Sequence, residues 1–453
     1  MTDHSRRRFL QTSGAVLGGM FAASSTVTAV ESDDRFIVKL SGNKSPSAEV
    51  VHDLSEIGYA VVRASESALE ADKAVKSFAP DVSLEVENPE QKSVTDDAAL
   101  ESLDDEFYAY QWDKQALDVP TAHETTTGEG TRIAIIDSGV DASHPDLEIN
   151  EALSKDFTGD GRGAGVPGGG DHGTHVAGIA GASNDGTTGV VGTAPDAELV
   201  DFRVFSNYGG QNGAFSIVVA AVLEAARTNC DVANLSLGAY PVPRQGLGSF
   251  YGGFLNKAMT YANKEGTLLV ISAGNDSVDL QHDNGETYCP PDGSPCYTLD
   301  GGHWISVPNE GAQALSVSAT GPIGFGYAAF AGEDLEAPAT TPANYTNYGT
   351  NAVALGAPGG NYKLSEKYLE PLGGVPAYAW DLVFSTVPGG YGWKAGTSMA
   401  APNVAGAAAL VKSANPDYSA NQVESALKRA AEVPSVAGKE YYGSGFLNIV
   451  DAL

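Results

Sequence analysis

Residues 133–140 read Ile-Ala-Ile-Ile-Asp-Ser-Gly-Val, an apolar run that ends in a carboxylate and a glycine turn. A short apolar run bounded by turn residues is typical of a strand buried on both faces. Comparable runs lie at 199–204, 232–237, 268–272, 315–319 and 353–355, and helical patterns lie at 214–228, 251–264, 398–413 and 420–431. Buried strands that alternate with crossover helices predict an α/β fold, a mostly parallel, doubly wound sheet with helices on both faces.

The composition is strongly acidic. The 453 residues include 57 acidic and 26 basic side chains, for a formal net charge of −31. Nucleic acid and anionic membrane surfaces are therefore poor partners, since both need Lys and Arg to neutralise them. The acidity fits either a solvated surface that keeps the protein soluble or adaptation to concentrated salt, which screens self-repulsion. We favour salt adaptation as a hypothesis.

The N-terminus has the pattern of an export signal. Residues 5–10 read Ser-Arg-Arg-Arg-Phe-Leu, and a weakly apolar run of small residues continues to Ala29. This predicts a signal peptide over 1–29 rather than an uncleaved anchor. Paired arginines before Phe-Leu resemble a twin-arginine signal, a route for exporting folded proteins. The mature protein is expected to be extracellular.

Residues 30–109 form a compositionally distinct block. Apolar patterns predict strands at 36–40, 60–63 and 83–86 and helices at 47–57 and 66–77, a small α+β unit. The acidic stretch 96–106 that follows is typical of an exposed, cleavable linker. From about Tyr110 to Leu453 the α/β pattern described above takes over.

Polar motifs stand where ligand sites of such sheets form, beyond the carboxyl ends of strands. Asp137 ends the run 133–136, and alone it would be read as a turn-capping residue. His172 opens the segment Asp-His-Gly-Thr-His-Val-Ala-Gly at 171–178, and His175 follows at i+3. A packed histidine is the plain interpretation, and a metal site is disfavoured because the glutamate of the metalloprotease pattern is missing.

Ser398 lies in Gly-Thr-Ser-Met-Ala-Ala-Pro-Asn-Val-Ala-Gly at 396–406. At the start of a helix it would be either an N-cap or a hydroxyl exposed beside backbone N–H groups that favour anions. Asn275 follows the run 268–272, and its side-chain amide can donate a hydrogen bond.

Together the motifs form a mechanism. A serine hydroxyl becomes a nucleophile when an imidazole takes its proton, and a carboxylate holds that imidazole in the correct tautomer. The backbone N–H of Ser398 and the amide of Asn275 are suitable donors to an oxyanion.

These motifs, in the chain order Asp, His, Ser, resemble the subtilisin family of serine peptidases from about Tyr110 onward, and the acidity suggests secreted halophilic (halolysin-like) members. The resemblance implies that Asp137 orients, His172 is the general base and acid, Ser398 attacks and Asn275 donates to the oxyanion. It implies a peptidase domain at 110–453 that acts on polypeptide substrates, functions as a monomer and needs no cofactor for the chemistry. Residues 30–109 occupy the place of the family's propeptide, an intramolecular inhibitor and folding chaperone.

By the same resemblance, an extended substrate adds as a strand between two edges. The substrate-binding residues would be Ser236, Leu237, Gly238, Ala273, Gly274, Tyr208 and Gly209. Ordinary strand-end packing is the alternative interpretation of these segments.

The chain also departs from the family pattern. Position 403 is Asn where the family commonly has His, and we expect a packing effect. The interval between Asn275 and Ser398 is unusually long, which puts substrate preference in doubt, and it contains Cys289 and Cys296, for which a disulfide and two free thiols remain equally open. Cys230 is expected to be a small buried residue. Structural calcium is common in the family, and Asp146 and Asp185 are candidate ligands.

Two other function classes remain open. A catalytically silent member would act as a binding protein or chaperone, and an esterase or acyltransferase would use the same triad. Every triad and oxyanion position holds the reactive residue type, which disfavours the first. The peptide-pairing edges disfavour the second.

Overall fold

The computed structural model describes residues 31–82, 94–95, 107–184, 189–208, 214–281, 287–288, 297–298 and 304–453. Its centre is a seven-stranded sheet in the order β16-β15-β11-β9-β6-β8-β7, and every neighbouring pair is parallel. The strands are β6 (Arg132–Asp137), β7 (Lys155–Asp156), β8 (Glu198–Arg203), β9 (Val232–Leu235), β11 (Leu268–Ser272), β15 (Ala314–Thr320) and β16 (Leu355–Pro358). The predicted parallel α/β fold is confirmed. Among the strands, β16 differs most from its expected range, because it begins at Leu355, the residue where the expected run 353–355 ends.

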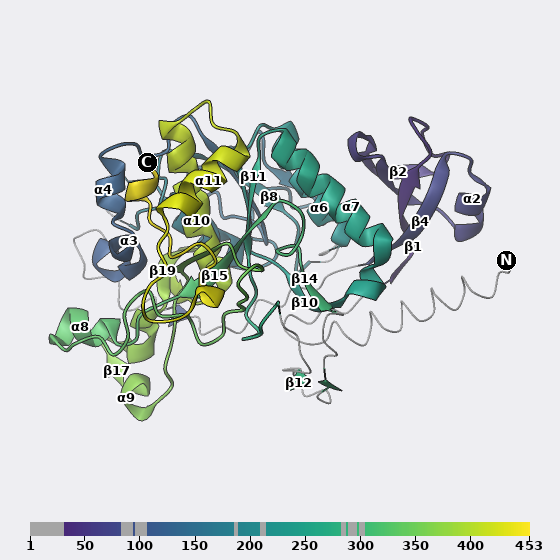
Figure 1. Ribbon diagram of the computed structural model, residues 1–453. Helices are drawn as coiled ribbons and strands as arrows, with labels where there is room; N and C mark the ends of the chain where they lie inside the picture. Colours follow the sequence, from purple (N-terminus) through teal and green to yellow (C-terminus); the bar gives the residue numbers. More distant parts are fainter. Residues whose placement is uncertain are drawn as a thin grey trace.

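The strands are buried on both faces, which explains their continuous apolar sequence. In β6, Ile133 and Ile135 join one hydrophobic cluster, while Ala134 and Ile136 join the other. The first cluster includes helices α5 (His172–Gly181), α10 (Thr397–Ala414) and α11 (Ala420–Ala430), and the second includes α6 (Phe215–Arg227) and α7 (Arg244–Lys264). Figure 1 shows α6, α7, α10 and α11 beside the central sheet.

The N-terminal unit is an antiparallel sheet in the order β2-β3-β1-β4, with one helix, α2 (Glu66–Ala71). Its strands are β1 (Glu31–Leu40), β2 (Glu49–Leu54), β3 (Tyr59–Arg63) and β4 (Val75–Val82). The helix expected over 47–57 was wrong, because Val50 pairs with Val62 and the segment adds as strand β2 before a short 3-10 turn at Ser55–Ile57. The helix expected over 66–77 ends at Ala71, because Val75 already pairs with Leu40 in β4. The strand expected at 83–86 lies outside the described residues.

This N-terminal sheet packs on α6 and α7 (Figure 1). The Tyr59 ring packs at a tilt against the Phe254 ring of α7, with ring centroids 5.0 Å apart and an interplanar angle of 50°. Asp81 is buried, pairs with Arg35 and accepts a hydrogen bond from the Ser216 backbone N–H in the first turn of α6 (3.2 Å). Burial raises the pKa of Asp81, so its charge depends on these partners.

Shorter elements surround this framework. They are the 3-10 turns Phe107–Tyr110 and Ala377–Asp381, α3 (Trp112–Ala116), α4 (Val119–His123), α8 (Phe325–Ala331), α9 (Glu366–Leu369), β5 (Val94–Thr95), β10 (Ala239–Pro243), β12 (Thr287–Tyr288), β13 (Tyr297–Thr298), β14 (Trp304–Val307), β17 (Pro371–Leu372), β18 (Val375–Pro376), β19 (Val383–Val387), β20 (Gly390–Lys394), and the 3-10 turns Lys439–Tyr441 and Val450–Ala452. Within the described ranges, no helix has both the length and the apolarity needed to cross a membrane.

The cysteines divide between two regions. Cys230 is a buried free thiol, as expected, and burial raises its pKa to about 11. Cys289 and Cys296 lie outside the described residues, so their pairing stays open.

Candidate active site

Asp137 and His172 meet at the carboxyl edge of the sheet. Asp137 is the last residue of β6, and His172 is the first residue of α5. His172 Nδ1 lies 2.8 Å from Asp137 Oδ1, which also accepts a hydrogen bond from the Ser138 backbone N–H (2.7 Å). Both side chains are largely buried, so the carboxylate is held against one ring nitrogen with little access for water.

The turn after Asp137 requires glycine. Gly139 has a φ of 99°, and a Cβ there would lie 2.2 Å from the Val166 carbonyl oxygen. Gly173 in the first turn of α5 is equally constrained, because its Cβ would lie 2.5 Å from the Gly139 carbonyl oxygen. The two glycines let the helix begin directly against the end of β6, which is what brings His172 to Asp137.

The contact with Asp137 defines the roles of the two imidazole nitrogens. A carboxylate accepts the proton of Nδ1–H, so Nε2 carries the lone pair in the neutral ring. Nε2 is buried and has no hydrogen-bond partner among the described residues. The imidazole is therefore arranged as a base whose accepting nitrogen is available.

Ser398 lies at the same edge of the sheet. It is the second residue of α10, whose N-cap is Gly396, so it is not the capping residue. Its Oγ donates to the Ser236 carbonyl oxygen (3.2 Å), and the Ser236 hydroxyl donates to the Ser398 carbonyl oxygen (2.7 Å). Ser236 follows β9, and β9 lies next to β6, the strand that ends in Asp137. The Ser398 hydroxyl therefore lies at the end of the strand that neighbours β6. In this arrangement the hydroxyl is bonded to Ser236 rather than to His172.

Asn275 follows β11, the next strand in the sheet order. Its Oδ1 accepts hydrogen bonds from the Thr397 backbone N–H (2.8 Å) and hydroxyl (3.0 Å). With Oδ1 turned toward Thr397, Nδ2 is the group that can donate to a bound oxyanion. The first backbone N–H groups of a helix lack intrahelical acceptors, so the Ser398 N–H can donate to the same oxyanion.

The comparison with known families agrees with this geometry. The family model described as the subtilase family matches residues 128–445. The chain belongs to the subtilase family.

Relatives of known activity support the assignment. The chain is 30% identical over 436 residues to the alkaline protease of Alkalihalobacillus alcalophilus, across 94% of this chain and 87% of that protein. It is 32% identical over 343 residues to subtilisin BL of Lederbergia lenta, across 74% and 96% of the two chains. This subtilase is a subtilisin-like serine endopeptidase.

A solved structure confirms the fold. The epidermin leader peptide processing serine protease of Staphylococcus aureus superposes with a TM-score of 0.69 at 21% identity, across 92% of this chain and 97% of that chain. The subtilisin-like architecture therefore extends through both the N-terminal sheet and the large α/β part of this subtilase.

The predicted substrate-binding residues fall at two strand ends of the subtilase. Ser236, Leu237 and Gly238 follow β9, while Ala273 and Gly274 follow β11. Gly274 has a φ of 99°, and a Cβ there would lie 2.4 Å from Asn347 Nδ2, so this position needs glycine. Tyr208 is 59% exposed, with the Arg162 guanidinium 3.5 Å from its ring centroid, and Gly209 lies outside the described residues.

The two calcium candidates, Asp146 and Asp185, fall in different parts of the structure's coverage. Asp146 Oδ2 accepts hydrogen bonds from the Val190 backbone N–H and the Tyr391 hydroxyl, both at 2.9 Å. Asp185, the other candidate, lies outside the described residues, and within the described ranges no three His, Cys, Asp or Glu side chains gather as metal ligands. His175 is buried, with Nε2 3.1 Å from the Gly392 carbonyl oxygen, which agrees with the packed-histidine interpretation.

Sequence reasoning missed an ion pair that joins the segments of two predicted catalytic residues, His172 and Ser398. Lys394 Nζ lies 2.9 Å from Asp171 Oδ2. Asp171 immediately precedes His172, and Lys394 lies four residues before Ser398. The only signal in the sequence was that an acidic residue lies next to one motif and a basic residue lies near the other. That signal does not show that the two side chains form an ion pair.

Proposed function

We propose that this subtilase hydrolyses peptide bonds through an acyl-enzyme on Ser398, with His172 as general base and acid, Asp137 as the orienting carboxylate and Asn275 as an oxyanion donor. The observation that supports it best is the Asp137–His172 contact of 2.8 Å, which leaves Nε2 available at the edge where α10 presents Ser398.

The reaction needs one side-chain rotation. Ser398 Oγ leaves the Ser236 carbonyl oxygen and turns to His172 Nε2, which takes its proton as Oγ bonds to the substrate carbonyl carbon. The Ser398 N–H and Asn275 Nδ2 then donate to the oxyanion. As the C–N bond breaks, Nε2 returns the proton to the departing amine. Water attacks the ester, again losing a proton to Nε2, and that proton returns to Ser398 as the acid product leaves.

A small phosphonylating reagent tests these roles. A fluorophosphonate should form a covalent adduct that peptide mass spectrometry locates on Ser398. His172→Ala should react at least about 100-fold more slowly, because general-base assistance typically contributes 10²–10⁴-fold. Labelling of another residue, or equal rates in the two proteins, would contradict the assignment.

We also propose that the subtilase is made as a self-processing precursor, with a propeptide at 30–109 and an acidic linker. The buried contacts of Asp81 and Tyr59 with α6 and α7 support this, because they make the N-terminal sheet a partner of the enzyme surface. Propeptide removal predicts a stable fragment that begins near residues 90–115 in the wild-type protein.

Export by the twin-arginine route and adaptation to high salt complete the proposal. Replacing Arg6 and Arg7 with Lys should retain the protein in the cell if that route is used.

The net charge of −31 supports salt adaptation, which predicts loss of folding or activity at low ionic strength. Protein that stays folded and active there would contradict it. Structural calcium, and function as a monomer, stay predictions.

An esterase or acyltransferase would use the same triad. Matched ester and amide substrates distinguish the two, because an endopeptidase must protonate an amine leaving group. Hydrolysis of the ester alone would contradict the proposed hydrolysis of peptide bonds by this triad.

A further inference from the structure

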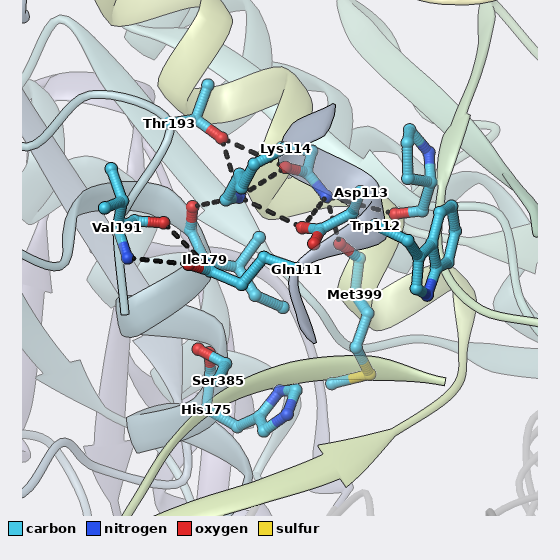
Figure 2. Close-up of polar contacts among 12 residues, drawn as sticks. Gln111, Trp112, Asp113, Lys114, His175, Ile179, Val191, Thr193, Ser385 and Met399 are labelled. Atoms are coloured by element: carbon cyan, nitrogen blue, oxygen red, sulfur yellow. Dashed lines mark hydrogen bonds and ion pairs between the residues drawn. The ribbon is translucent and has the colours of Figure 1, made fainter. Parts of the chain in front are cut away.

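Lys114 in α3 is completely buried and bonds to three different segments. Its Nζ donates to the Ile179 carbonyl oxygen (2.9 Å), the Thr193 hydroxyl (2.9 Å) and Asn403 Oδ1 (2.6 Å). An ammonium group has three protons, so these partners use its full donor capacity. Figure 2 shows the contacts with Ile179 and Thr193 beside the buried residues of α3.

The charge of Lys114 is balanced within the same cluster. Asp113 Oδ2 lies 3.2 Å from Nζ, and both side chains are inaccessible to solvent. Asn403 Nδ2 donates to the Pro358 carbonyl oxygen (3.1 Å) and lies 3.4 Å from Asp113 Oδ2. Burial lowers the pKa of Lys114, while Asp113 favours its charged form. Removing one partner would leave buried polar groups unpaired, which is costly.

The Lys114 contacts connect the two helices that carry the catalytic residues. Ile179 is in α5, seven residues or about two turns after His172, and Asn403 is in α10, five residues after Ser398. The helices approach closely, since a Cβ at Gly406 would lie 2.5 Å from Thr193 Cβ and 2.9 Å from the Ala180 carbonyl oxygen. One ammonium group therefore ties the helix of the base to the helix of the nucleophile.

We propose that Lys114 is a positioning residue that holds α5 against α10 and so fixes His172 relative to Ser398. The proposal rests on the triad proposed above and goes beyond it, because Lys114 lies outside the triad and the oxyanion donors. It also gives Asn403 a specific role: its amide accepts from Lys114 and donates to the Pro358 carbonyl oxygen at the end of β16, so the departure from His at this position is more than a packing effect.

The test compares two variants of the cluster with a matched control. Lys114→Met removes the ammonium group at similar length, and Asn403→Leu removes its acceptor while Lys114 stays. Lys412→Met is the control, because Lys412 also lies in α10 but its Nζ donates to the Pro416 (2.7 Å) and Tyr418 (2.8 Å) carbonyl oxygens beyond the far end of the helix. Each variant is measured below the onset of its own thermal unfolding.

The readouts are kcat and KM for a peptide amide and the rate of Ser398 labelling by a small fluorophosphonate. A misplacement of about 1 Å can cost 10²-fold in rate, so we expect kcat and the labelling rate of both cluster variants to fall about tenfold or more, with KM within about twofold. Lys412→Met should match the wild type. A structural role alone would lower the unfolding temperature without changing these rates in folded protein.

Cluster variants with wild-type kcat and labelling rates overturn the proposal, as does a rise in KM at constant kcat. If Lys114→Met does not fold, Asn403→Leu decides. A parallel Ser398→Ala measurement separates the two proposals. Unchanged cluster variants beside an inactive Ser398→Ala overturn only the role of Lys114, whereas an active Ser398→Ala overturns the triad and the role of Lys114 together.

Discussion

Asn275→Leu should slow hydrolysis without weakening substrate binding. The substitution keeps the side-chain size but removes the Nδ2 donor, which acts when charge develops on the carbonyl oxygen. Loss of one such donor, as at the equivalent asparagine of subtilisin, costs about 10²–10³-fold in kcat, or about 2.7–4 kcal/mol of barrier. We expect that loss with KM nearly unchanged, since the neutral carbonyl of bound substrate gains little from the donor.

The structure adds a second effect that must be separated from the first. Asn275 Oδ1 also accepts from the Thr397 backbone N–H and hydroxyl, so Asn275→Leu leaves these donors unpaired and costs about 1–3 kcal/mol of stability. Thr397→Val is the matched control, because it removes one of these hydrogen bonds and keeps the Nδ2 donor. Steady-state kinetics on a peptide amide, with thermal unfolding in parallel, distinguish the effects. A kcat for Asn275→Leu within threefold of wild type would refute the oxyanion role.

Three further predictions concern charge. Asp137→Asn should lower kcat about 10⁴-fold, because an amide can hold the wrong imidazole tautomer; restoration of activity merely by raising substrate concentration would argue against this. Burial raises the pKa of Asp201 to about 7, so the folded protein holds a proton there that the unfolded chain loses above about pH 4, and stability falls as pH rises toward 7. The free energy of unfolding of Asp201→Asn, measured in urea relative to that of the wild type, should therefore rise by roughly 3 kcal/mol between pH 5 and pH 9. A difference between the two proteins that stays constant with pH would contradict this titration. Asp81→Ala leaves Arg35 buried without its partner and should cost the N-terminal sheet about 3–5 kcal/mol, seen as faster hydrogen exchange in β1 and β4 but not in β6; uniform exchange rates would contradict a local effect.

The parallel sheet was predictable because its strands are apolar on both faces. Ile133–Ile136 contains no polar residue, and neither does Leu268–Ile271, so both segments are easily recognised as buried strands. The segment 47–57 was misassigned because its short mixture of apolar and polar residues fits either period. Pairing of Val50 with Val62, which the local sequence does not encode, decides its structure.

The candidate site was predictable where chemistry is concentrated in short motifs. Asp137, His172, Asn275 and Ser398 each sit in a recognisable stretch at a strand or helix end. The hydrogen bond of Ser398 to Ser236 was not predictable, because it depends on a rotamer. The Lys114 cluster was missed because its hydrogen bonds join residues 65, 79 and 289 positions apart, and a single lysine in an α-helical stretch is normally exposed.

The most direct test of the catalytic assignment compares wild type with Ser398→Ala in high salt, with the mass of each chain followed as it matures. We predict that wild type shortens near residues 90–115 and hydrolyses a peptide amide, while Ser398→Ala stays full length and inactive. If both chains shorten equally and neither cleaves the peptide, another protease performs the processing and Ser398 is not the nucleophile of a self-maturing enzyme.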